Sequence, residues 1–106
     1  MLEVSALSLT YVRTAVRHRQ AGLTVDPTGN TVQMAFPAVG VDPVSGDWKT
    51  ASWETDTTLT PDAYYARCLV GPGGTIALAA GTYGVWVKVT ATPEIPVIKA
   101  GPMRVR

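Results

Sequence analysis

The stretch GTYGVWVKVT, residues 81–90, alternates between apolar side chains and polar or small ones. Successive side chains of a β-strand point to opposite faces, so this alternation predicts a strand with one buried face. The row expected to face the core consists of Tyr83, Val85, Val87 and Val89. The opposite row turns Trp86 and Lys88 toward water, and a monomer has little reason to expose that pair. The pattern therefore indicates a strand that presents a contact surface on its outer side.

The same alternation recurs through the rest of the chain. The other rows expected to face the core are Val12, Thr14 and Val16; Val32, Met34 and Phe36; Ala66, Cys68 and Val70; and Met103 with Val105. Shorter strands are expected around Leu7 and Leu9, around Ile76 and Leu78, and as a polar strand from Trp48 to Trp53. No segment of ten or more residues has the 3.6-residue period of a helix.

Turn-forming residues separate these segments. Turns are expected at DPTGN (26–30), at GPGG (71–74), and at Pro93 and Pro96, which cannot donate a hydrogen bond inside a sheet. Seven or eight short strands separated at this spacing are typical of an antiparallel sandwich. The sequence therefore predicts an all-β fold, a single antiparallel β-sandwich of about seven or eight strands.

Length and composition narrow the class of protein. A chain of 106 residues suits one domain, 1–106, with a core just large enough for independent folding. Hydrophobic residues make up 46% of the chain and charged residues 16%, which predicts a globular chain and not a disordered one. No apolar run approaches the ~18 residues of a membrane helix. The net charge is only +1, so neither nucleic acid nor a membrane is expected as a partner.

Cys68 is the only cysteine, so no disulfide can form within the chain. We interpret it as a small buried hydrophobic residue, because it lies in an apolar row. The first ten residues include Glu3 and lack the pattern of a secretory signal. Both features agree with folding in a reducing cytoplasm.

No set of residues has the pattern of a catalytic, metal or phosphate site. His18 is the only histidine, and the sequence places no partner set beside it, so we interpret it as a solvated side chain. The segment from Asp42 to Asp47 has too few charged oxygens for a calcium loop. The glycines at 71–74 precede no helix and lack the lysine of a phosphate loop. The sequence predicts no enzyme activity, no metal and no cofactor.

The candidate functional residues are therefore those of a contact surface. They are Trp86, Lys88, Arg13, Arg17, Arg19, Trp48 and Trp53. For Trp86 three interpretations stay open: an anchor in a subunit interface, a rim residue over the core, or a platform for a sugar ring. The three arginines suit either a solvated strand face or docking on an acidic partner subunit.

The segment DAYYARC, residues 62–68, invites comparison with the immunoglobulin strand motif D-x-A-x-Y-x-C, whose tyrosine forms the tyrosine corner. Asp62 and Cys68 have the matching separation. Ala66 stands where the motif has tyrosine, and Tyr64 stands where it has alanine, so the motif does not match. No corner hydrogen bond is predicted here.

Taken together, the order of strands and turns resembles small immunoglobulin-like virion proteins of tailed bacteriophages and prophages. It is also similar to the N-terminal sandwich of phage upper baseplate proteins, in which a D-x-T-G turn precedes an alternating strand. The segments that carry the resemblance cover most of the chain: YVRTAVRHR (11–19), VDPTGNTVQMAF (25–36), DWKTASWE (47–54), YYARCLVGPGG (64–74), GTYGVWVKVTATPEIPV (81–97) and AGPMRVR (100–106).

The resemblance implies an immunoglobulin-like sandwich and a structural role. Baseplate proteins continue into long C-terminal regions, whereas this sequence ends at Arg106, so the resemblance points to a free-standing subunit of the capsid surface or head-to-tail junction. Its implied partners are the major capsid protein or connector and tail subunits, in a homo-oligomeric arrangement, with assembly in the host cytoplasm. The alternative function is a carbohydrate-binding sandwich for attachment to the host surface, with Trp86 or the pair Trp48 and Trp53 as the glycan platform.

Overall fold

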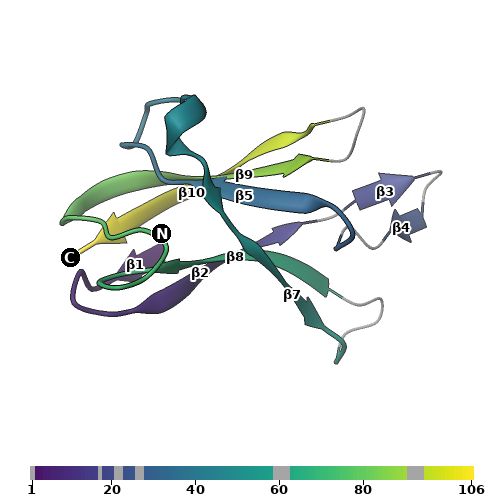
Figure 1. The fold of residues 1–106 in the computed structure, drawn as a ribbon, viewed down its shortest axis with the longest axis horizontal. Helices are drawn as coiled ribbons and strands as arrows, with labels where there is room; N and C mark the ends of the chain where they lie inside the picture. The colour runs from purple at the N-terminus through teal and green to yellow at the C-terminus, as the bar shows by residue number, and fades with distance from the viewer. Residues whose placement is uncertain (1, 17, 21–22, 26–27, 59–62, 91–94) are drawn as a thin grey trace.

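The computed structural model describes residues 2–16, 18–20, 23–25, 28–58, 63–90 and 95–106, and in this part it consists of two packed β-sheets (Figure 1). Its elements are β1 (Leu2–Val4), β2 (Thr10–Val16), β3 (His18–Gln20), β4 (Leu23–Val25), β5 (Thr31–Ala35), the 3-10 turn η1 (Ser45–Asp47), β6 (Lys49–Thr50), β7 (Ser52–Asp56), β8 (Ala63–Val70), β9 (Gly81–Thr90) and β10 (Val97–Val105). The predicted all-β sandwich is confirmed.

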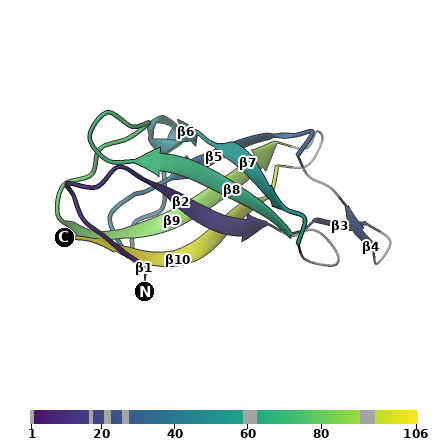
Figure 2. The same cartoon turned by 90° about the horizontal axis from the view of Figure 1, so that it is seen from below.

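The order of the strands is that of an immunoglobulin-like sandwich. One sheet has the order β1-β10-β9-β5-β6 and the other has the order β2-β8-β7. These correspond to the G, F and C strands with additions at both edges, and to the B, E and D strands. All neighbours are antiparallel except β1 and β10, which run parallel. Strands β3 and β4 form a separate hairpin that projects from one end (Figures 1 and 2).

The core lies between the two sheets and is built from the predicted rows. Fully buried side chains come from both layers, and their most deeply buried members are Met34, Met103, Val12, Val87 and Cys68. Tyr83 is half-buried and packs against this core. Because branched and thioether side chains fill the space between the sheets, the alternation of valines accounts for the two-layer packing.

Two of the short predicted strands do not form. Residues 5–9 make a turn and irregular backbone, and Leu7 is 90% exposed. After the turn at 71–74 the chain is irregular up to Ala80, with only an isolated bridge between Val70 and Ile76. A three-residue alternation is too short to distinguish a strand from a loop whose apolar side chains touch the core edge, as Ile76 and Leu78 do.

The polar strand predicted between Trp48 and Trp53 is divided between the two sheets. β6 pairs with β5 in the five-stranded sheet, and β7 pairs with β8 in the three-stranded sheet. Ala51 alone separates them, and its N–H donates to the Val32 carbonyl at 3.1 Å. A single residue therefore carries the chain from one layer to the other.

A tyrosine corner lies at the start of β9. The Tyr83 hydroxyl donates a hydrogen bond to the Ala79 carbonyl at 2.7 Å. This tyrosine stands two residues before Val85, which takes the place of the strand F cysteine of antibody domains. The motif at 62–68 therefore lies on the wrong strand for a corner, since β8 is in the E position and β9 in the F position.

Removing this hydroxyl should destabilise the fold measurably. Tyr83→Phe deletes the bond to Ala79 but keeps the ring on the core, so we expect the free energy of unfolding to fall by about 1 kcal/mol. Urea denaturation measures the change. Tyr11→Phe is the control, because no hydrogen bond of the Tyr11 hydroxyl is seen among the described residues, and it should change stability by less than about 0.5 kcal/mol. Equal effects of the two substitutions would contradict the corner.

Candidate functional site

The outer face of the five-stranded sheet holds Trp86, as predicted, but its indole is not free in water. Val85 and Val87 point into the core, so Trp86 points outward, where it is half-buried. The indole lies against the sheet near Gly84, because a Cβ atom at Gly84 would come within 3.1 Å of the indole Nε1. That Nε1 is buried and has no hydrogen-bond partner among the described residues. The Lys99 ammonium lies 5.6 Å from the ring centroid.

A second tryptophan–lysine pair occupies the same face. The Lys88 ammonium lies 4.6 Å from the ring centroid of Trp48, within the range of cation–π attraction. Trp48 directly follows η1, and the loop that carries η1 lies on the outer side of the sheet (Figure 1). The loop therefore brings Trp48 over the strand that bears Trp86 and Lys88.

This sheet face is basic. Strands β5, β6, β9 and β10 contain four basic residues and no acidic residue, the basic ones being Lys49, Lys88, Lys99 and Arg104. None of these four forms an ion pair within the part of the chain that the structure describes. We name Trp48, Trp86, Lys88 and Lys99 the tryptophan–lysine face.

The opposite sheet neutralises its own cations. Glu54 of β7 pairs with Arg13 of β2 and, at 3.2 Å, with Arg67 of β8. The hydrogen bond from Arg13 lowers the pKa of Glu54 and raises the pKa of Arg13. Arg67 also lies 4.3 Å from the ring centroid of Tyr11, and Arg13 lies 5.4 Å from that of Tyr65. Arg13 is therefore engaged with its own sheet and is a weaker candidate for an acidic partner.

Trp53 lies on the inner side of its sheet and not on an outer surface. It pairs with the fully buried Ala66, packs against the core, and donates from Nε1 to the Asn30 carbonyl at 2.9 Å. Trp48 lies on the outer face of the other sheet. The predicted platform of Trp48 with Trp53 is therefore wrong, because the two rings share no face.

The remaining basic candidates give no site. Arg17 lies outside the described residues. Arg19 belongs to β3, where it pairs with Thr24, and nothing is described of its side chain or of that of His18.

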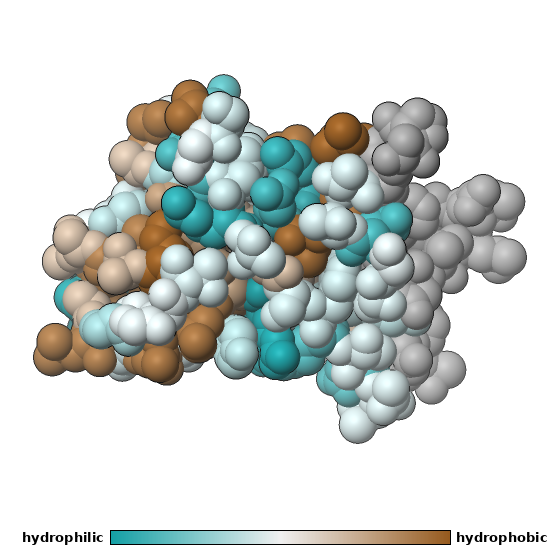
Figure 3. Space-filling model, viewed as in Figure 1, coloured by the Kyte–Doolittle hydropathy of each residue, from teal (hydrophilic) through white to brown (hydrophobic). Residues whose placement is uncertain are grey.

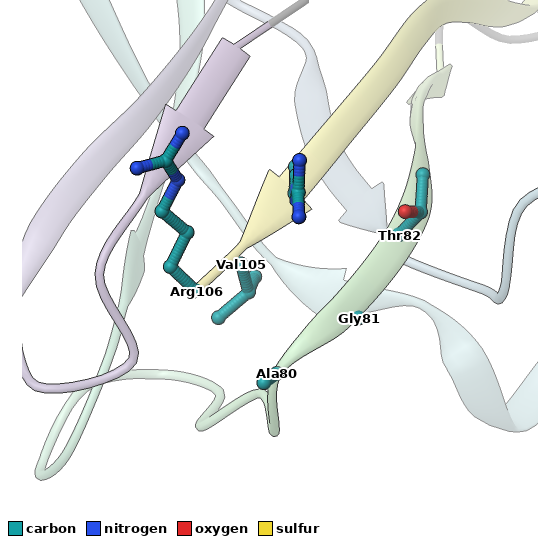
Figure 4. Close-up of a pocket in the computed structure, with 6 residues that line it drawn as sticks. Ala80, Gly81, Thr82, Val105 and Arg106 are labelled. Atoms are coloured by element: carbon teal, nitrogen blue, oxygen red, sulfur yellow. The ribbon is translucent and has the colours of Figure 1, made fainter.

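The described residues offer little for chemistry. No three His, Cys, Asp or Glu side chains of the described ranges lie together as a metal could require. A surface depression next to the C-terminal end of β10 is lined by Ala80, Gly81, Thr82, Arg104, Val105 and Arg106 (Figure 4). Arg106 is held there by Glu3 at 2.8 Å, and the lining has no acidic or imidazole side chain. Burial raises the pKa of the Cys68 thiol, which favours the less reactive neutral form.

Among the described residues, no helix has the length and apolar character that crossing a membrane requires. Comparison of the chain with models of known families, with curated proteins and with solved structures finds no match. The resemblance to phage virion proteins therefore stays a prediction from the sequence.

Two contributors to the basic character of this face were missed by sequence reasoning. Lys99 and Arg104 lie on β10, which begins at Val97, six residues before the predicted pair Met103 and Val105. The register with β9 shifts between Lys99 and Gly101, and this bulge interrupts the alternation that would have revealed the longer strand. The apolar pair Val97 and Ile98 before Lys99 was the available signal.

Proposed function

We propose that the protein is a non-enzymatic structural protein of a tailed-phage virion, which docks on the capsid surface or head-to-tail junction through the tryptophan–lysine face. The sequence resemblance supports the class of protein. The fold is compatible with it, because an immunoglobulin-like sandwich presents a broad outer sheet face to a neighbour.

The observation that carries the proposal is the contrast between the two outer faces. Lys88 and Lys99 lie over tryptophan rings without an acidic partner in the described part of the chain, while Arg13 and Arg67 share Glu54. Tryptophan is enriched among residues that dominate binding energy, and unpaired cations favour an acidic surface. The partner is therefore an acidic patch on another virion protein.

Exposed aliphatic side chains give a second, weaker support. Apolar surface gathers at the end of the sandwich that carries both chain termini (Figure 3). Strongly exposed residues in the loops before β2 and before η1 are Leu7, Leu9, Val39, Val41 and Val44. Apolar surface of this kind is commonly covered in an assembly.

A glycan platform is the weaker proposal. Sugar rings stack on an open aromatic face, but lysine ammonium groups lie over the rings of Trp48 and Trp86. Trp53 is turned to the core. A sugar would have to displace a lysine before it could stack.

Cosedimentation tests the docking proposal. The purified protein is mixed with heads and tails of the phage or prophage whose genome encodes it, and bound protein is measured at low and high salt. We expect binding that weakens with salt and a loss of at least about tenfold in affinity for the double variant Lys88→Ala, Lys99→Ala. Arg13→Ala is the control, since it removes an exposed charge from the opposite face.

Three outcomes would contradict the proposal. They are no binding of the unaltered protein to any virion part, an equal loss in the Arg13→Ala control, and retention of full binding by the double variant. A response of tryptophan fluorescence to cell-wall glycans, without binding to particles, would favour the alternative function instead.

A further inference from the structure

Most sheet edges of the described fold carry a feature that blocks pairing with another strand. Edge strand β6 has only two residues. The edge of β10 beyond β1 is interrupted by the bulge between Lys99 and Gly101, and Pro102 there has no N–H. β7 carries the charged side chains Glu54 and Asp56. Short strands, bulges, proline and charges are the usual means of protecting an edge.

Strand β2 has none of these protections. It pairs with β8 over seven consecutive residues without a register shift, from Thr10 with Val70 to Val16 with Tyr64. It contains no glycine or proline, and its one charged residue, Arg13, is held by Glu54 of the same sheet. No described strand pairs with its other side, and Figure 2 shows β2 at the margin of its sheet. A long, regular edge of this kind is a template for strand pairing.

We propose that β2 pairs antiparallel with β2 of a second copy, so that two three-stranded sheets join into one six-stranded sheet across a two-fold axis. Such a contact is isologous, which is the commonest arrangement of homodimers. The proposal does not rest on the docking function, because the tryptophan–lysine face lies on the other sheet.

The sequence of β2 complements itself. Antiparallel pairing centred on Val12 places Tyr11 opposite the partner's Arg13, a favourable aromatic–cation pair, and Thr10 opposite the partner's Thr14. Pairing centred on Arg13 would place two arginines directly opposite each other and is disfavoured. Tyr11 is 47% exposed, so its ring is available to a second chain. Inward residues stay inward, so both cores remain covered.

Sedimentation equilibrium over a range of protein concentrations tests this dimer. Thr14→Lys places an inward-pointing charge on the β2 edge, which blocks edge pairing. Thr55→Lys is the matched control, because Thr55 is an exposed-edge threonine in the other edge strand of the same sheet. We expect the unaltered protein and Thr55→Lys to dimerise, and Thr14→Lys to show a dissociation constant raised at least tenfold.

Amide hydrogen exchange of the unaltered protein keeps the test independent of how well the variants fold. β2 amides should be more protected at high than at low protein concentration, while β7 amides do not change. A monomer up to about 1 mM, where even a weak dimer is populated, would overturn the proposal. So would a dimer whose protection falls on another strand, or one weakened equally by both variants.

Discussion

Gly71→Ala is expected to lower the free energy of unfolding by about 3 kcal/mol or more, since backbone strain and steric overlap add. Gly71 has a φ of 134°, and a Cβ atom there would lie 2.1 Å from the Ser8 carbonyl oxygen. That oxygen belongs to the backbone, so no side-chain rotation relieves the overlap. The turn after β8 and the loop before β2 would have to separate.

Gly73→Ala in the same turn is the control for Gly71→Ala. Gly73 also has a positive φ, 80°, but a Cβ atom at this position would have nothing within 4 Å. Its cost should be only about 1–2 kcal/mol, from backbone conformation alone. Chemical denaturation of both variants gives the difference. Equal losses would mean that the close approach to Ser8 is not what requires glycine at position 71.

Met34→Ala is expected to lower the free energy of unfolding by about 2–5 kcal/mol, the range for removing a large side chain from a packed core. Met34 is fully buried and pairs with the equally buried Val87 at the centre of the sandwich. A domain of this size has a total stability of about 5–15 kcal/mol, so the loss is a large fraction of it.

Leu7→Ala is the control for Met34→Ala, because Leu7 is 90% exposed. It should change stability by less than about 0.5 kcal/mol. Thermal and urea unfolding of the two variants decide the matter. A small effect at Met34 would show that the two sheets do not pack on each other as described.

The alternation of side chains is sufficient to predict the class of fold. Rows such as Val85, Val87 and Val89 repeat over whole strands, and one buried face requires that period. The same alternation does not distinguish strands from loops at Leu7 or Ile76, where only two apolar residues alternate. The last strand is longer than predicted, because the bulge before Gly101 changes the phase of β10.

The surface is harder to predict than the core, because surface roles depend on residues far apart in the sequence. Arg13 is expected from the sequence to be a solvated or docking cation, but Glu54, 41 positions later, is its partner. Trp53 is expected outside and lies inside, because the chain changes sheets at Ala51 and the face of Trp53 cannot be counted from Trp48. The corner at Tyr83 escapes a motif that depends on a cysteine, because Val85 stands in that place.

The parallel pairing of β1 with β10 has a consequence for synthesis. Leu2 pairs with Met103, so the five-stranded sheet cannot be completed until the ribosome has made almost the whole of the sequence. At about 5–20 residues per second, the first strand waits roughly 5–20 s for its neighbour. During that time the nascent chain carries unpaired apolar segments, so chaperone capture in this interval should govern the yield of protein.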